Sequence, residues 1–487
     1  MVISGSMVRI SRPEIPRVDL PGGDNLQIGV AHLIGVCGSG MKALAELLGG
    51  MGCRVTGSDL HASEATVSAF SRRGLRVHCG HQENFVPADA DVVIYSPAVP
   101  ADNPERRSAL RLGIPQFSYS QMLGHLMRGK TGVCIAGTHG KSTTTAMTGC
   151  ALTEAELYPS VVFGAELCQW RASGWAGDGE HFVVESCEFQ RNFLDLSPTH
   201  AAILGIEPDH FDCFHHFDET IAAFAEFAQK VPADGSILIP IGGDAAKAAC
   251  LAAEAPVETF GLVSEADWWA ADIRPTQAGV RFRTFCRGEF FSEIALRVPG
   301  RHNVLNALAA VALSHRSGAS VAAIREGLAE FPGIRRRFEV VGSWRGATLI
   351  DDYAHHPTAV AVTLATARER YPRRRLWCAF QPHQVSRTMA LMPEFAASLA
   401  RADEVLLVPV FAARERVDQE PETASMELAS RVVAAGGRAR FLPTLDRAVA
   451  TLDDELKPGD VLITMGAGDI GQVHYAFTRR LQRNHAS

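Results

Sequence analysis

The stretch TGVCIAGTHGKSTTT, residues 131–145, decides how the central part of this chain folds. Residues 131–136 are apolar or small and predict a buried strand, and the residues after Lys141 predict a helix. A glycine-rich turn between a strand and a helix points backbone N–H groups at an anion, and the helix dipole adds partial positive charge there. Lys141 then reaches the outer phosphates of a nucleotide, and Ser142 can hold Mg²⁺. The stretch therefore predicts a binding site for a nucleoside triphosphate.

The phosphate loop is a contracted form of the common one. The full pattern would have glycine at position 135, where this chain has Ile135. An ATPase of this type also needs an acid at the end of a neighbouring strand to orient Mg²⁺, and Glu185 directly follows the apolar run 182–184. A further strand ends in GIEPDHFD, residues 205–212, which brings the imidazole of His210 to a polar turn. A glutamate at a strand end is as often a solvated surface residue, so the weight of Glu185 comes from the loop that precedes it. A single histidine is more often structural.

The residues before the phosphate loop predict a separate nucleotide-binding unit. An apolar run at residues 27–35 leads into GVCGSG, residues 35–40, and then into a helix-like segment. A second strand begins at Arg54 and ends in residues 57–59, which places Asp59 about twenty residues after the glycines, as in nucleotide-binding α/β units. A third strand at residues 91–95 is followed by Ser96. We therefore expect a parallel sheet wound with helices.

The residues after the phosphate loop predict an antiparallel segment and then a third α/β unit. Polar and apolar residues alternate over residues 268–298, and an alanine-rich helix follows residues 300–303. Strands at residues 348–350, 376–380, 405–409 and 461–465 each precede a polar or glycine-rich turn. We predict an α/β protein of three domains: a Rossmann-like domain at 1–126, a central ATPase-like mixed sheet with the phosphate loop at 127–333, and a Rossmann-like domain at 334–487.

Composition excludes several classes of protein. The 54 acidic and 47 basic residues among 487 give a net charge of -7, so the positive field that gathers nucleic acid is missing. The eleven cysteines form no CxxC pair, which predicts a reducing, cytoplasmic location. The sequence has no apolar run of about eighteen residues and no apolar leader, so we expect neither membrane insertion nor secretion. The oligomeric state is left open.

The motifs resemble, in order and spacing, those of the Mur ligases over about residues 30 to 475. The resemblance rests on residues 137–145, Glu185, residues 208–212, GRHN at 300–303 with Asn306, and DDYAHHP at 351–357. Further motifs are similar to those of the branch that joins L-alanine to UDP-N-acetylmuramate; they lie at residues 32–41, 336–338, 380–383, 386–388 and 466–471. The resemblance implies an ADP-forming amide ligase of peptidoglycan precursor synthesis, which uses ATP and Mg²⁺ and forms an acyl phosphate.

The same resemblance implies roles for individual residues. Three are expected to be catalytic: Lys141, Glu185 and His210. Three are expected to hold Mg²⁺: Ser142, Glu185 and His210. The expected ATP-binding residues are Gly137, Thr138, Gly140, Lys141, Ser142, Thr143, Asn303, Arg336, Arg337 and Asp351. UDP-N-acetylmuramate is expected at Gly35, Gly38, Gly40, Asp59 and Ser96, and L-alanine at Tyr353, His355, His383 and Arg387.

Two departures from the family pattern bear on the second substrate. Gly205 stands where an asparagine is usual, and Gln384 stands where some members carry arginine. Glutamine cannot clamp a carboxylate with two charge-assisted bonds, so recognition of the amino acid would rest more on Arg387. One alternative is therefore a ligase that adds a recycled peptide to UDP-N-acetylmuramate.

Two alternatives come from other classes of protein. The departures leave room for a catalytically degenerate sensor that binds UDP-sugar, although Lys141, Ser142, Glu185 and His210 are all present. A dehydrogenase would rest on the glycine turn at residues 35–40 and Asp59 alone, and a lone glycine turn is weak support.

Overall fold

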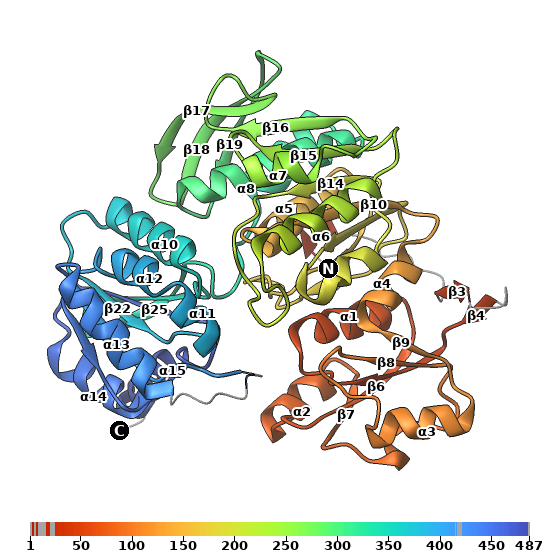
Figure 1. The fold of residues 1–487 in the computed structure, drawn as a ribbon, viewed down its shortest axis with the longest axis horizontal. Coiled ribbons are helices and arrows are strands. Elements are labelled where there is room, and N and C mark those ends of the chain that lie inside the picture. The colour runs from red at the N-terminus through yellow and green to blue at the C-terminus, as the bar shows by residue number, and fades with distance from the viewer. Residues whose placement is uncertain are drawn as a thin grey trace.

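Three large sheets follow one another along the chain, and each has helices on its faces (Figure 1). The computed structural model describes residues 2–3, 6–7, 16–19, 25–413, 415 and 421–485. In Figure 1 the first unit is red to orange, the central unit yellow to green, and the third unit cyan to blue. Among the described residues, no helix is both long and apolar enough to cross a bilayer.

The first unit is a five-stranded, wholly parallel sheet in the order β7-β6-β5-β8-β9. Its elements are β5 (Val30–Ile34), α1 (Ser39–Gly50), β6 (Arg54–Asp59), α2 (Glu64–Ser71), β7 (Arg76–Cys79), η1 (Glu83–Phe85), β8 (Val92–Tyr95), α3 (Pro104–Leu112), β9 (Gln116–Ser118) and α4 (Tyr119–Met127). This confirms the predicted α/β class. Strand β6 runs on to Asp59 because its polar end still pairs with β7. Two short strand pairs precede it: β1 (Val2–Ile3) with β2 (Ser6–Met7), and β3 (Arg17–Asp19) with β4 (Asn25–Gln27).

The central unit is a ten-stranded mixed sheet in the order β12-β11-β13-β10-β14-β15-β16-β17-β18-β19. Its strands are β10 (Thr131–Ala136), β11 (Ser160–Val162), β12 (Gly174–Trp175), β13 (His181–Glu185), β14 (His200–Ile203), β15 (Ser236–Pro240), β16 (Val257–Gly261), β17 (Trp268–Pro275), β18 (Val280–Cys286) and β19 (Glu289–Leu296). Strands β17, β18 and β19 are antiparallel, as the alternating pattern predicts. Its helices are α5 (Lys141–Glu154), η2 (Phe189–Asp195), α6 (Phe217–Gln229), α7 (Asp244–Ala249), α8 (Arg301–Arg316) and α9 (Val321–Ala329).

The third unit is a six-stranded sheet in the order β20-β21-β25-β22-β23-β24, parallel except for β20. Its elements are β20 (Glu339–Trp344), β21 (Ala347–Asp352), α10 (Pro357–Arg370), β22 (Leu376–Phe380), α11 (Val385–Ala390), α12 (Met392–Leu399), β23 (Glu404–Leu407), α13 (Pro421–Ala434), β24 (Ala439–Phe441), α14 (Leu445–Glu455), β25 (Val461–Met465) and α15 (Gln472–His485). We keep the domain boundaries as a proposal; the first, between 126 and 127, falls at the end of α4.

The first and central units share one hydrophobic cluster, whereas the third unit has its own. The shared cluster includes Leu123 and Met127 of α4, which belong with Phe193 of η2 and the residue Leu196 that follows it. The apolar cores of the third unit contain residues from 338 onward. The first two units are therefore joined through buried apolar surface, and the third unit contacts the central unit through the ion pair of Arg387 and Asp209.

Candidate active site

The phosphate loop connects β10 to α5 and has a backbone that suits glycine at two positions. Gly137 has φ 120°, and a Cβ there would lie 2.7 Å from the backbone nitrogen of Leu204. Gly140 has φ 82°, and a Cβ there would lie 2.3 Å from Oδ1 of Asn306. Because α5 begins directly after Gly140, the first N–H groups of the helix lack intrahelical acceptors and face the loop. The expected ATP-binding residues Gly137, Thr138, Gly140, Lys141, Ser142 and Thr143 thus lie in one turn whose backbone N–H groups can bind an anion.

The ammonium group of Lys141 is paired with a carboxylate that the sequence did not single out. Lys141 Nζ lies 3.0 and 3.2 Å from the two carboxylate oxygens of Glu188, and it also donates to the carbonyl of Gly137 at 2.5 Å. Glu188 is 2% exposed. Burial alone would lower the pKa of Lys141, but the charge of Glu188 outweighs it and raises the pKa above its ordinary value. Lys141 is therefore fully charged, and a bound phosphate must replace or join Glu188.

Ser142 and Glu185 lie side by side at the start of α5 and the end of β13. The Ser142 hydroxyl donates to Glu185 Oε2 at 2.7 Å, and the backbone N–H of Gly164 donates to the same oxygen at 2.6 Å. Neighbouring oxygen ligands of an octahedral Mg²⁺ at 2.0–2.1 Å are about 2.9 Å apart. The hydroxyl and the carboxylate therefore have the chemistry and the spacing to hold Mg²⁺ together.

His210 faces Glu188, the acid that the sequence did not predict. Its Nε2 lies 3.7 Å from Glu188 Oε1, and its buried Nδ1 has no hydrogen-bond partner among the described residues. Burial lowers the pKa of His210, although Glu188 acts in the opposite direction, so the imidazole is neutral at pH 7. The expected metal ligands therefore separate into the pair Ser142 and Glu185, and His210 beside Glu188.

A cavity of about 360 Å³ lies between the first and central units and joins two groups of expected residues. Residues lining it from the first unit include Gly38, Gly40, Ser96 and Tyr119, and those from the central unit include Glu185 and Asn192. Helix α1 begins after Gly38, so its positive end faces this space. Tyr119 and Asn192 were not predicted, because no local motif marks them.

Two further residues expected at the UDP-sugar support the glycine turn of the first unit. A Cβ on Gly35 would lie 2.9 Å from Cβ of Ser96, so glycine allows these two loops to approach closely. Asp59 accepts the backbone N–H groups of Cys37 and His61, each at 2.9 Å. The carboxylate of Asp59 therefore stabilises the glycine turn by accepting these two backbone hydrogen bonds.

The four residues expected to bind the amino acid meet in the third unit. The rings of Tyr353 and His355 are 5.2 Å apart, and those of His355 and His383 are 5.8 Å apart. Arg387 Nη1 lies 3.2 Å from His383 Nδ1. Burial and the nearby Arg387 cation lower the pKa of His355 well below its ordinary value. The cluster thus combines the Arg387 cation with the neutral imidazole of His355.

Asp209 of the central unit closes this cluster from the other side. Its Oδ1 accepts from Arg387 Nε at 2.8 Å, and Arg387 Nη2 lies 2.7 Å from the same oxygen. Although burial acts to raise it, the pKa of Asp209 is held far below its usual range by His210 and Arg387. Sequence reasoning missed Asp209 as a partner of Arg387, because the two residues are distant in sequence and lie in different units.

The remaining expected ATP-binding residues lie around β21 and the start of α8. Arg336 Nε is 3.3 Å from Asp351 Oδ2, and its Nη2 donates to the carbonyl of Gly466 at 2.6 Å. The side-chain amide of Asn303 donates to the carbonyl of Pro299 at 2.7 Å and accepts from Asn306 at 3.2 Å. These residues are therefore engaged with neighbours inside the chain.

Arg337 belongs to the same neighbourhood. Its guanidinium lies 5.4 Å from the ring centre of Tyr353. Burial lowers the pKa of His302, the residue before Asn303, to about 4, and the Arg337 cation contributes to this effect. Arg337 is thus close enough to the start of α8 to act on it electrostatically.

Family models match three consecutive parts of the chain. They are described as the Mur ligase family catalytic domain at residues 30–131, the Mur ligase middle domain at residues 135–314, and the Mur ligase glutamate ligase domain at residues 336–468. Together with the phosphate loop, this order defines an ATP-dependent ligase with three α/β units. The chain belongs to the Mur ligase family.

Individual relatives agree with this family over most of their length. A UDP-N-acetylmuramate--L-alanine ligase of Desulfitobacterium hafniense is 40% identical over 91% of this chain and 98% of its own. One from Salinibacter ruber is 39% identical over 94% of this chain and 96% of its own. The solved structure of UDP-N-acetylmuramate-alanine ligase from Thermotoga maritima superposes with a TM-score of 0.78 and 27% identity, covering 93% of this chain and 99% of that chain.

Proposed function

We propose that this chain joins L-alanine to UDP-N-acetylmuramate in an ATP-dependent, ADP-forming reaction of peptidoglycan precursor synthesis. The observation that carries the proposal is the cavity between the first and central units, because Gly38 and Ser96 line it together with Glu185. A nucleotide sugar anchored at the start of α1 then has its carboxyl group beside the phosphate loop. Relatives at 39 and 40% identity, named UDP-N-acetylmuramate--L-alanine ligase, support the same reaction.

Activation of the carboxylate is the step that needs ATP. A carboxylate oxygen is a poor leaving group, whereas the phosphate of an acyl phosphate departs readily when an amine attacks. The phosphate loop and Lys141 hold the nucleotide phosphates, and Lys141 stabilises the charge on the transferring phosphoryl group. Mg²⁺, held by Ser142 and Glu185, supplies further positive charge when it is bound. His210 and Glu188 border this centre, and we propose that His210 contributes to the metal site through its unpartnered Nδ1.

The second substrate enters from the side of the third unit. Arg387 is 2% exposed and its Nη1 lies 3.2 Å from His383 Nδ1, so we propose that it binds the α-carboxylate of L-alanine. His355 Nδ1 lies 2.8 Å from the carbonyl of Tyr353, which fixes the proton on Nδ1 and leaves Nε2 as an acceptor. Because burial lowers the pKa of His355, the ring is neutral, and we propose that its Nε2 accepts a hydrogen bond from the amine of L-alanine.

Two further parts of the proposal concern the third unit and the location of the protein. Exclusion of water protects an acyl phosphate, and we propose that closure of the third unit brings Arg337 and Asp351 onto ATP.

All eleven cysteines are unpaired, which fits a reducing compartment, so we propose that the enzyme works in the cytoplasm.

The test is ADP release by the purified full chain with ATP, Mg²⁺ and UDP-N-acetylmuramate. We expect release when L-alanine is added, and Lys141→Ala should reduce the rate on the order of 10²- to 10³-fold, since it removes a preorganised charge. The matched control is Lys247→Ala, because Lys247 is an exposed lysine on α7. Release with a peptide but not with L-alanine would favour the peptide ligase, an outcome that Gln384 makes worth testing. No release with any amine would support a UDP-sugar sensor.

A further inference from the structure

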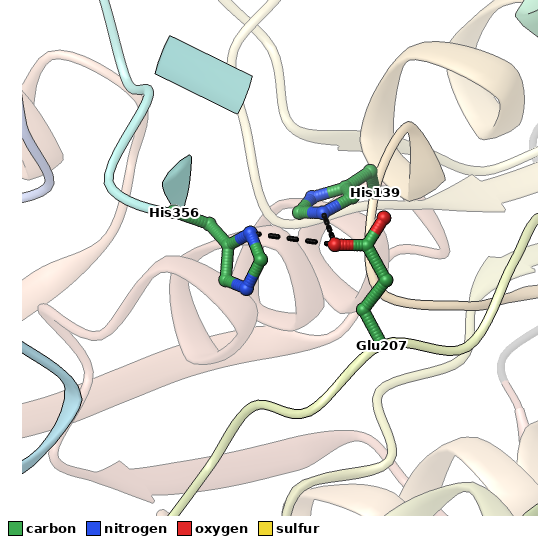
Figure 2. Close-up of side chains that lie close together, drawn as sticks. All are labelled: His139, Glu207 and His356. Carbon is green, nitrogen blue, oxygen red and sulfur yellow. Dashed lines mark ion pairs between the residues drawn. The ribbon is translucent and has the colours of Figure 1, made fainter. Parts of the chain in front are cut away.

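Three side chains from separate parts of the fold converge beside the phosphate loop (Figure 2). His139 belongs to the phosphate loop, Glu207 follows β14, and His356 precedes α10 in the third unit. His139 Nε2 lies 3.4 Å from Glu207 Oε2, and His356 Nδ1 lies 3.6 Å from the same oxygen. The ligand atoms of all three residues lie within 4.8 Å of one another. None of the three is needed for the roles proposed above.

The spacing of these atoms matches a tetrahedral metal site. Zinc binds imidazole nitrogen and carboxylate oxygen at about 2.0–2.1 Å, so two ligands of one tetrahedral ion are about 3.3 Å apart. The two contacts of Glu207, at 3.4 and 3.6 Å, are close to this value. The two imidazole rings are tilted by 55° with centroids 4.8 Å apart, so they are not stacked on each other. A small cation between the three atoms would need little rearrangement.

The surrounding contacts orient the three groups as metal ligands are usually oriented. His356 Nε2 lies 3.3 Å from the carbonyl of Pro208, which places the ring proton on Nε2 and leaves Nδ1 with a lone pair toward Glu207. The Thr358 hydroxyl donates to Glu207 Oε2 at 2.7 Å and fixes the carboxylate. The remaining contact of His356 Nδ1 is a long one, 3.4 Å, from the backbone N–H of Thr358.

The protonation states at neutral pH also suit a cation. Although burial acts to raise it, the pKa of Glu207 is lowered to about 2 by His139, Thr358 and His356, so the carboxylate is ionised. Burial lowers the pKa of His356, and its neighbour His139 acts in the same direction. His139 Nε2 is buried and has no hydrogen-bond partner among the described residues. An ionised carboxylate thus faces two imidazole nitrogens, and all three ligand atoms are close enough together to be shared by one metal ion.

We propose that His139, Glu207 and His356 form a binding site for a divalent transition-metal ion of the zinc type. Two imidazoles and one carboxylate select such an ion over Mg²⁺, which prefers oxygen ligands. Three protein ligands leave the fourth tetrahedral position for water. Because His139 and His356 belong to the phosphate loop and to the third unit, the bound ion ties these two parts together. The site stands independently of the proposed ligase reaction.

A second group of ligands must be distinguished in any test. Cys187, Glu188 and His210 also have ligand atoms within 4.8 Å of one another. This group contains a thiol, whereas the proposed site contains none. A metal ion at Cys187 would produce a sulfur-to-metal charge-transfer band with Co²⁺, and an ion at the proposed site would produce only the visible bands of a tetrahedral nitrogen and oxygen site.

The experiment is a Co²⁺ titration of the full chain without added nucleotide, followed by displacement with Zn²⁺. We expect tetrahedral visible bands in the unmodified chain and in Cys187→Ser, and their loss in His139→Asn and in His356→Asn. Asparagine at position 356 keeps a favourable residue at the start of α10, so this variant should fold. The matched control is His215→Asn, because His215 is exposed and outside both groups.

A second measurement keeps the proposal falsifiable if a variant folds poorly. Zn²⁺ should raise the thermal unfolding midpoint of the unmodified chain and of His215→Asn, but not that of His356→Asn. Thr358→Val, which removes only the hydroxyl that orients Glu207, should weaken Zn²⁺ binding about 10- to 100-fold. Absence of tetrahedral bands in the unmodified chain would overturn the proposal. Bands that survive in His356→Asn and vanish in Cys187→Ser would also overturn it, by placing the ion at the other group.

Discussion

The ammonium group of Lys141 is paired with the carboxylate of Glu188, whereas the family resemblance implies that it binds a nucleotide phosphate. Both oxygens of Glu188 are within 3.2 Å of Lys141 Nζ, and Glu188 is 2% exposed. A buried ammonium without a counter-charge is strongly unfavourable. We therefore propose that Glu188 supplies, in the free protein, the negative charge that nucleotide phosphates supply when they bind.

This pairing predicts a specific behaviour of Glu188→Gln. The substitution removes the counter-charge of Lys141, and breaking a buried pair costs on the order of 3–5 kcal/mol. Bound MgADP restores negative charge at the loop, so it should raise the thermal midpoint of the variant more than that of the unmodified chain. The measurement is thermal unfolding with and without MgADP, and the exposed Glu265→Gln is the control. An equal rise in both proteins would show that Glu188 does not act as a phosphate substitute.

His302 predicts a dependence of stability on pH. Burial, assisted by Arg337, lowers the pKa of His302 to about 4, whereas an unfolded histidine has a pKa near about 6.5. As the pH falls below about 6.5, the unfolded chain takes up a proton that the folded chain refuses, so stability is full above that pH and is lost toward pH 4. At about pH 4.5 the loss should reach about 2–3 kcal/mol.

The measurement for His302 compares urea unfolding of the unmodified chain and His302→Leu at about pH 7.5 and about pH 4.5. The difference in free energy of unfolding between the two proteins should move in favour of the variant at the lower pH. A difference that stays constant with pH would mean that His302 is protonated as readily in the folded chain as in the unfolded chain. The test does not depend on any assigned catalytic role.

The sequence predicts the residues of local motifs well and their distant partners poorly. The glycine turns, Lys141 and Ser142 follow from a strand, a turn and a helix that are continuous in sequence. Glu188 escaped prediction because the backbone after it turns sharply, with Gln190 and Arg191 at φ 51° and 59°. Asp209 escaped because its partner Arg387 is 178 residues away. Such contacts depend on how whole units pack, which no local pattern encodes.

At the scale of elements, apolar runs bounded by polar turns give strands near their true limits. Strands β22 and β25 begin and end at the predicted residues, since their neighbours on both sides bury them. The order of the strands within each sheet does not follow from such local patterns. Strand β13 lies between β10 and β11, and this insertion brings Glu185 beside the phosphate loop. The pairing arises from long-range contacts and was not predicted.

Helix α4 predicts a large difference between two similar substitutions. A Cβ on Gly124 of α4 would lie 2.2 Å from the carbonyl oxygen of Asp195 in η2, which leaves no room for alanine. On Gly49 of α1 it would lie 3.9 Å from a Leu75 methyl group, an ordinary contact. Gly124→Ala should therefore destabilise the chain by about 1–3 kcal/mol, the usual cost of overpacking.

The matched control for Gly124→Ala is Gly49→Ala, which should be neutral or stabilise its helix by up to about 1 kcal/mol, because alanine favours helix. Thermal unfolding of both variants gives the comparison. If both substitutions had the same effect, α4 and η2 would not pack as closely as described. The junction between the first and central units would then have to be looser.

At the scale of the whole molecule, the three units are joined in two different ways. The first and central units share apolar core residues, and such an interface resists sliding. The contacts described between the central and third units are largely polar; they include Arg387 with Asp209 and Thr358 with Glu207. Polar contacts of this kind can be exchanged for substrate contacts. We therefore expect movement during turnover to be concentrated in the third unit.

The ion pair of Asp209 and Arg387 tests this view. Asp209→Ala leaves the Arg387 cation buried without its partner, which should cost on the order of 3–5 kcal/mol. The loss should appear as faster hydrogen exchange in α11, which carries Arg387. The matched control is Asp272→Ala, because the Asp272–Arg283 pair is about half exposed and contributes less than about 1 kcal/mol. Equal exchange in both variants would mean that the pair does not restrain the third unit.

The cavity between the first two units has one further consequence. Its two ends, at the start of α1 and at Glu185, belong to units that pack as one body, so the length between them is fixed. If the UDP-sugar binds there as proposed, this fixed length selects an acid whose carbon skeleton reaches from the pyrophosphate at the start of α1 to Glu185. A donor shortened by removal of its nucleotide would lie loosely, and its acid group would miss the phosphoryl donor.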